Sequence, residues 1–158
     1  MSESPPLLPP TFRTHCPSAL GVGCSGVKSM AIEHVGIWVR DLERMRQFYV
    51  EKLGAESGAL YENARTGFRS YFLSFGEGAR LEIMGRPASP LADKAAESHS
   101  LGYAHVALRL GTRAAVDEWV SRLASQGVVV AGSPRVTGDG HYEAVIEDPE
   151  GNRIELVA

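Results

Sequence analysis

Two histidines and two glutamates recur at nearly the same spacing in the two halves of the sequence. Glu82 lies 48 residues after His34, and Glu155 lies 50 residues after His105. Imidazole nitrogens and carboxylate oxygens are ligands of divalent transition metals, and a carboxylate can also carry a proton to or from a substrate. The residue types and their spacing therefore indicate a divalent-metal site with a proton-transfer group beside it.

Each of these residues also has a structural explanation when it is taken alone. A strand histidine is commonly a hydrogen-bonded structural residue, and Arg80 and Arg153 each stand two residues before a glutamate that they could pair with. Four groups that converge without a cation, however, would bring two carboxylates together, which is unfavourable. Taken jointly they favour a metal. Two imidazoles and two carboxylates suit Ni²⁺, Zn²⁺, Co²⁺ or Fe²⁺, with Ni²⁺ or Zn²⁺ preferred, and suit Ca²⁺ or Mg²⁺ poorly.

The elements that position these residues form an internal repeat. Segments 32–39 and 103–110 are β-prone, have a histidine near the start and are 71 residues apart. Each is followed by a helical pattern with one apolar face, capped by Asp41 or Thr112 at its start and by a glycine at its end. The apolar positions are Leu42, Met45, Phe48, Tyr49 and Leu53 in the first helix, and Ala115, Val116, Trp119, Val120 and Leu123 in the second.

After each helix the sequence predicts three further strands. They cover about 56–64, 69–76 and 79–85 in the first half, and about 128–136, 141–147 and 152–157 in the second. Side chains alternate along a strand, so each His and each Glu points away from the aliphatic face that the helix should cover. The fold class is therefore α+β, with two βαβββ modules forming a curved mixed sheet around a more polar concave face.

The domain organisation follows from a change in composition near residue 30. Residues 1–29 hold five of the nine prolines and both cysteines, and they are expected to be a disordered tail. The G-x-G-x-x-G match at 21–26 lacks the strand and helix that a dinucleotide site requires. Residues 30–158 are expected to form the folded domain, with module 1 over about 30–86, a linker over about 87–101 and module 2 over about 102–158.

Composition excludes several functional classes. The net charge of −3 gives no electrostatic drive toward nucleic acid, so no nucleic-acid partner is expected. No apolar run approaches the roughly 20 residues of a membrane helix, so no membrane partner is expected either. The absence of cysteine after residue 29 excludes a disulfide scaffold and a cysteine nucleophile in the body, and it favours a cytoplasmic protein.

The two-fold βαβββ pattern and its motifs resemble the vicinal oxygen chelate superfamily, and within it the short glyoxalase I-like proteins. The segments that carry the resemblance are 32–37, 103–108 and the ending Asp-Pro-Glu-Gly-Asn-Arg-Ile-Glu-Leu at 148–156. The superfamily also includes dioxygenases, epimerases and antibiotic-binding proteins of the bleomycin resistance type. The resemblance implies metal ligands at His34, Glu82, His105 and Glu155, which is the ligand set of bacterial-type glyoxalase I.

The implied activity is that of a metal-dependent lyase or isomerase of the lactoylglutathione lyase type. Its substrate would bind the metal through two adjacent oxygens, with Glu155 as the base and Glu82 as its partner in catalysis. Another metalloenzyme of the superfamily, a dioxygenase or an epimerase, is an alternative, as is a non-catalytic antibiotic or small-molecule binder. The glutathione-binding residues of authentic lyases have no convincing counterpart here, so glutathione or another thiol adduct stays an open expectation.

The resemblance also concerns assembly and substrate contacts. It implies a homodimer with composite sites, in which His34 and Glu82 come from one chain and the other two ligands come from its partner. Candidate substrate-binding residues are Arg80, Arg153, Trp38 and Tyr142.

Overall fold

The computed structural model describes residues 31–87 and 102–158 of the chain. The expected tail over 1–29, its glycine-rich segment and nearly all of the expected linker lie outside the described residues. Contacts divide the chain into two units, Met1–Ala31 and Ile32–Ala158, and all the described helices and strands belong to the second.

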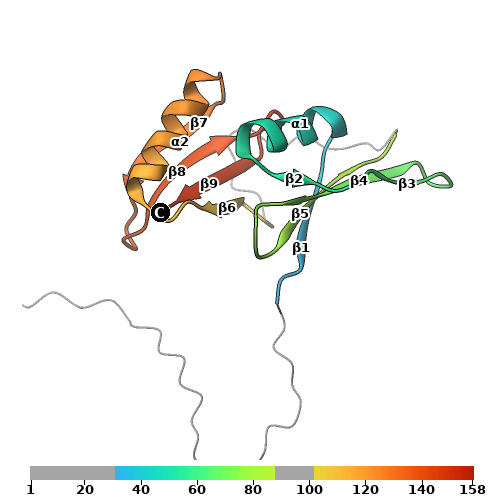
Figure 1. The fold of residues 1–158 in the computed structure, drawn as a ribbon, viewed down its shortest axis with the longest axis horizontal. Helices are drawn as coiled ribbons and strands as arrows, with labels where there is room; N and C mark the ends of the chain where they lie inside the picture. Colours follow the sequence, from blue (N-terminus) through green and yellow to red (C-terminus); the bar gives the residue numbers. More distant parts are fainter. Residues whose placement is uncertain (1–30, 88–101) are drawn as a thin grey trace, which may run out of the picture. The chain divides into compact units, whose positions relative to one another are not determined.

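The first module of this unit contains five strands and one helix (Figure 1). Their bounds are β1 His34–Trp38, α1 Leu42–Leu53, β2 Glu56–Ser57, β3 Tyr61–Asn63, β4 Phe68–Ser74 and β5 Arg80–Gly85. The prediction of a single strand over about 56–64 is wrong. Two short strands, β2 and β3, pair separately with β4, and the pairing register shifts by one residue between them.

The second module repeats the same order (Figure 1). Its elements are β6 His105–Arg109, α2 Arg113–Ser125, β7 Val130–Val136, β8 Tyr142–Glu147 and β9 Arg153–Val157. The predicted duplication is confirmed, because each module runs strand, helix and then an antiparallel series of strands. Neither described helix is long and apolar enough to cross a membrane.

Both helices begin and end where the sequence predicts. The Asp41 side chain accepts a hydrogen bond from the backbone N–H of Arg44 at 3.0 Å, and Gly54 ends α1 with a φ of 74°. The Thr112 hydroxyl caps α2 in the same way, and the chain turns at Gly127 with a φ of 80°. All five predicted apolar positions of α1 are buried, and α2 buries Val116, Val120 and Leu123.

The strands form two mixed sheets, one in each module. The order is β1-β5-β4-β2 in the first sheet, with β3 also paired to β4, and β6-β9-β8-β7 in the second. In each sheet the first strand of the module runs parallel to the last, and the other pairings are antiparallel. The predicted α+β class of two βαβββ modules is confirmed, but each module has its own sheet among the described residues, so one continuous sheet is not observed.

The two modules share a core, and polar contacts also join them. Buried residues of both modules form one apolar cluster, which includes Leu73 and Ile83 from the first and Ile146 and Leu156 from the second. The Glu150 carboxylate accepts hydrogen bonds from the backbone N–H groups of residues 40 and 41, each at 2.9 Å, just before α1. The side chains of Tyr49 and Asp148 form a second contact, and a guanidinium of α2 donates to the carbonyl of residue 52.

Candidate functional site

Parallel pairing of β1 with β5 brings His34 and Glu82 to the same face of the first sheet. Gly36 is the register partner of Glu82, so His34 lies one alternation back along β1 on the same side. The His34 Nε2 and Glu82 Oε2 atoms are 3.8 Å apart. The predicted convergence of these two residues is therefore present in the structure, and both side chains are only partly exposed.

The second module repeats this geometry. Ala107 is the register partner of Glu155, and His105 precedes it by one alternation. The His105 Nε2 and Glu155 Oε2 atoms are 3.2 Å apart. The opposite faces of β5 and β9 carry buried aliphatic residues in contact with the core, as the alternation predicts.

These separations can be compared with those that a shared metal ion requires. Two ligands at about 2.1 Å from one ion, at angles between 90° and 109°, are about 3.0–3.4 Å apart. The second pair lies within this range, and the first pair would close by a few tenths of an ångström. Each pair offers one imidazole nitrogen and one carboxylate oxygen, the donor types that transition metals accept. The residues of each module therefore fit half of a four-ligand metal site.

Glu33 contacts the imidazole of His34 on the side away from Glu82. Its carboxylate accepts a hydrogen bond from His34 Nδ1 and also pairs with the guanidinium of Arg80. These contacts, first with His34 and then with Arg80, hold the pKa of Glu33 below its usual value. A carboxylate on Nδ1 leaves Nε2 directed at Glu82, which is the arrangement that orients metal-binding histidines. Sequence reasoning missed Glu33, although its place beside His34 was a signal.

The four predicted ligands form two pairs and not one cluster. Within residues 31–87 and 102–158, no three side chains of His, Cys, Asp or Glu come together in a way that could hold a metal ion. One pair lies on the first sheet and the other on the second sheet. A four-ligand site would therefore require the two pairs to face each other. The two modules of one chain do not bring them together in this way.

The four residues predicted to contact substrate lie in different surroundings. Arg80 stacks over the Phe72 ring at 4.3 Å, and Trp38 stands on the same face of the first sheet as His34. Arg153 is exposed at the start of β9. The hydroxyl of Tyr142 donates to Asp117 of α2 at 2.6 Å, so that side chain turns to the helix side and the structure does not bring it to Glu155.

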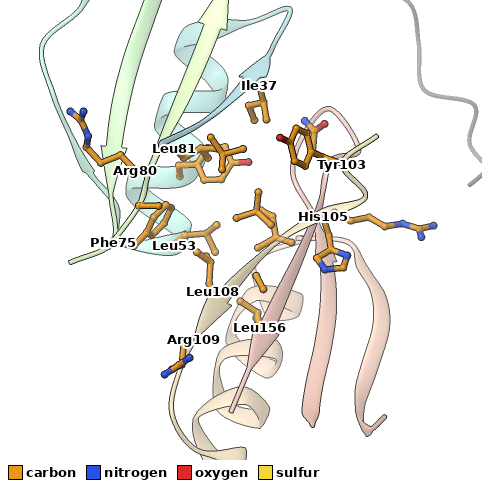
Figure 2. A pocket seen from close by; sticks show the side chains of 18 of the residues that line it. Ile37, Leu53, Phe75, Arg80, Leu81, Tyr103, His105, Leu108, Arg109 and Leu156 are labelled. Atoms are coloured by element: carbon orange, nitrogen blue, oxygen red, sulfur yellow. The ribbon is translucent and has the colours of Figure 1, made fainter. Parts of the chain in front are cut away.

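A cavity of about 680 Å³ separates the modules on the aliphatic side of β1 and β6. In Figure 2, Ile37 and Leu81 of module 1 and Leu108 and Leu156 of module 2 turn toward this space. The guanidinium groups of Arg80 and Arg109 turn outward from it. Most of its lining comes from the faces opposite the two His–Glu pairs. Of the four predicted ligands, His105 lines the cavity, and His34, Glu82 and Glu155 do not.

Comparison with known proteins agrees with this duplicated architecture. The family model described as Glyoxalase/Bleomycin resistance protein/Dioxygenase superfamily matches residues 31–156. The chain belongs to this superfamily, and the resemblance read from its sequence is confirmed.

Individual relatives are distant. A lactoylglutathione lyase of Haemophilus influenzae is 30% identical over 128 residues, which cover 81% of this chain and 92% of the relative. An uncharacterised protein of Bacillus subtilis, YqjT, is 26% identical over 133 residues, which cover 80% of this chain and 98% of the relative. The crystal structure of a glyoxalase family protein from Enterococcus faecalis superposes with a TM-score of 0.66 at 26% identity, covering 80% of this chain and 96% of that one.

Proposed function

We propose that this protein is a metal-dependent lyase or isomerase of the glyoxalase I type. The observation that carries the proposal is the pairing of one His and one Glu in each module at ligand-like separations, 3.8 Å and 3.2 Å. The lactoylglutathione lyase among the relatives supports the same reaction class. The substrate in this proposal is a small molecule with two oxygens on adjacent carbons.

The metal ligands in this proposal are His34 and Glu82 from one chain and His105 and Glu155 from a second copy. A homodimer is proposed because each pair lies on a separate sheet and supplies only half of the ligands. When bound, a divalent cation such as Ni²⁺ or Zn²⁺ offsets the negative charge that develops on the two oxygens. Glu33 keeps the imidazole of His34 oriented through its Nδ1 atom.

Glu155 moves the proton in the proposed reaction. Its carboxylate takes the proton from the hydroxyl-bearing carbon of the substrate and returns it to the neighbouring carbonyl carbon, while the hydroxyl proton passes to the former carbonyl oxygen. No electrons leave the substrate, so no redox cofactor is required. The side chain suits this role because it is 18% exposed and its carboxylate lies 3.2 Å from His105 Nε2.

Metal analysis tests the ligand assignment. Glu82→Ala and His105→Ala should each lower the nickel or zinc content of the purified protein sharply, since each removes one of four ligands. The matched control is Glu143→Ala, because Glu143 is a carboxylate of the second sheet that pairs with Arg135 and not with a histidine. Unchanged metal content in both ligand variants would refute the site.

Mixing of inactive variants tests the composite site. If sites form across a dimer, Glu82→Ala mixed with Glu155→Ala produces one intact site in each mixed dimer, and metal binding and activity return. Glu82→Ala mixed with His34→Ala is the control, because both lesions lie in module 1 and no intact site can form. The assay is thioester formation from methylglyoxal and glutathione with Ni²⁺ or Zn²⁺ restored. Recovery in neither mixture, with subunit exchange verified, would refute the cross-chain arrangement.

A further inference from the structure

The face of the first sheet that carries His34 and Glu82 continues into an apolar surface. Register pairs place Trp38 beside Met84, Met84 beside Ser70, and Ser70 beside Tyr61. This row lies two residues beyond Glu82 along β5, which corresponds to about 7 Å. A small molecule held at the His–Glu pair would therefore extend onto this row.

Three aromatic rings stand together at this place, and we call Trp38, Tyr61 and Phe68 the aromatic wall. The Trp38 and Phe68 rings meet edge to face with centroids 5.9 Å apart, and the Tyr61 and Phe68 rings are 6.1 Å apart. Trp38 is 47% exposed and Tyr61 is 54% exposed. Single exposed apolar residues are ordinary, but a contiguous aromatic group on a functional face has ring surface available for a ligand.

Gly36 and Met84 lie between the His–Glu pair and the aromatic wall. A Cβ atom at Gly36 would come within 2.9 Å of the methyl carbon of Met84 and within 3.9 Å of Glu82 Oε2. No side chain of β1 therefore stands between His34 and Trp38. Because the Met84 side chain is unbranched, it can yield to the shape of a bound group.

Ser70 adds a second observation at the same place. Its side chain is almost fully buried between Phe68 and Phe72 along β4, and its hydroxyl has no hydrogen-bond partner among the described residues. An unpaired buried hydroxyl destabilises a fold, so a purely structural sheet face would not be expected to contain one.

The second module does not repeat the aromatic wall. The position that matches Trp38 is Arg109, which lies beside Val157. The positions that match Ser70 and Tyr61 are Glu143 and Arg135, whose side chains form an ion pair at 3.0 Å. The repeat therefore keeps the His–Glu pair in both modules and keeps the aromatic rings in one.

We infer that the substrate carries an aromatic ring on one of the two adjacent carbons that bear its oxygens, and that this ring contacts the aromatic wall. The inference rests on the proposed function, since the wall is placed relative to the His34–Glu82 pair. A ring at this position would pack edge to face or offset against Trp38 and Tyr61, and Met84 would adjust to it. A methyl group at the same carbon would be too short to reach the wall.

Two α-hydroxy acids that differ only in this substituent test the inference. Mandelate carries a phenyl group and lactate carries a methyl group, and both present the same adjacent oxygens. Isothermal titration of the nickel-loaded full chain should give a dissociation constant for mandelate on the order of tenfold lower than for lactate, because a phenyl ring buries more apolar area. Trp38→Ala and Tyr61→Ala should each bring the two constants close together, and Arg109→Ala at the matching position of module 2 should preserve their ratio.

The outcomes separate the substrate class from the metal function. Equal affinities for mandelate and lactate in the nickel-loaded protein would overturn the aromatic substrate and leave the metal site intact. If metal analysis of the same sample finds no nickel, the proposed metal function fails. The aromatic wall is then tested with the metal-free protein. A preference for mandelate that Trp38→Ala or Tyr61→Ala abolishes would support the inference. Binding of neither acid would overturn it.

Discussion

The hydrogen bond between Tyr49 and Asp148 is a buried polar link between the two modules. The Tyr49 hydroxyl donates to Asp148 Oδ2 at 3.0 Å, and the two residues are 3% and 4% exposed. The same carboxylate also accepts from the backbone N–H groups of Glu150 and Asn152 and from the Asn152 side chain, at 2.8–2.9 Å. Tyr49→Phe removes one donor of four and leaves the ring in the core.

The expected loss in free energy of unfolding is about 2 kcal/mol, since a hydrogen bond to a charged group contributes about 1.5–3 kcal/mol. Tyr71→Phe is the matched control, because the Tyr71 hydroxyl donates to Glu43, whose side chain is 54% exposed. That partner can be hydrated when the bond is lost, so the control should lose less than about 1 kcal/mol. Urea unfolding at pH 7 and fixed protein concentration measures both values.

The pH dependence of the same variant gives a second, independent measurement. Burial, and then the charge and hydrogen bond of Asp148, raise the pKa of Tyr49 above its ordinary value of 10.0. Above about pH 10 the unfolded chain loses this proton while the folded protein keeps it, so the wild-type free energy of unfolding falls as pH rises. The advantage of the wild type over Tyr49→Phe should therefore shrink above pH 10. A loss below 0.5 kcal/mol at pH 7, or one equal to that of Tyr71→Phe, would refute the reasoning.

Two further predictions concern stability. Glu150→Ala should lower the free energy of unfolding by about 0.5–1.5 kcal/mol, because two backbone N–H groups before α1 lose the carboxylate that accepts their hydrogen bonds, and urea unfolding measures this. An unchanged midpoint would show that this carboxylate does not stabilise the junction. Ser70→Ala should leave the melting temperature unchanged or raise it, since the hydroxyl it removes has no described partner; a fall of several degrees would show that the hydroxyl is paired.

The sequence predicted features that depend on local periodicity. The apolar stripe of α1 and the caps Asp41 and Thr112 follow from residue spacing within one element, and the structure confirms them. The pairing of His34 with Glu82 also needed only the alternation of side chains and a parallel pairing of the first strand with the last. These interactions are short in range or follow from the repeat, so a pattern in the sequence records them.

The features that sequence reasoning missed depend on how distant segments meet. The contact of Glu150 with the backbone before α1 joins residues about 110 positions apart, and no periodic pattern marks it. No periodic pattern marks the aromatic wall either. Tyr61 reaches Phe68 only because β3 pairs with the first residues of β4. The break of the 56–64 segment into β2 and β3 was missed because it is a one-residue shift in how the segment pairs with β4, and that depends on a distant strand.

A duplicated module has two kinds of position on its functional face, and they are constrained differently. In the proposed metal site the His and Glu of each module have to meet at ligand distance, and the parallel pairing of first and last strands places both in the same register in the two sheets. Trp38 and Arg109 lie two alternations beyond the histidine of their own strand, outside the His–Glu pairs, and these two residues differ in chemistry. A site assembled from one module of each kind would have an aromatic end and a charged end around a symmetric set of ligands. The repeat can therefore keep one chemistry at its centre while the residues around it select a substrate.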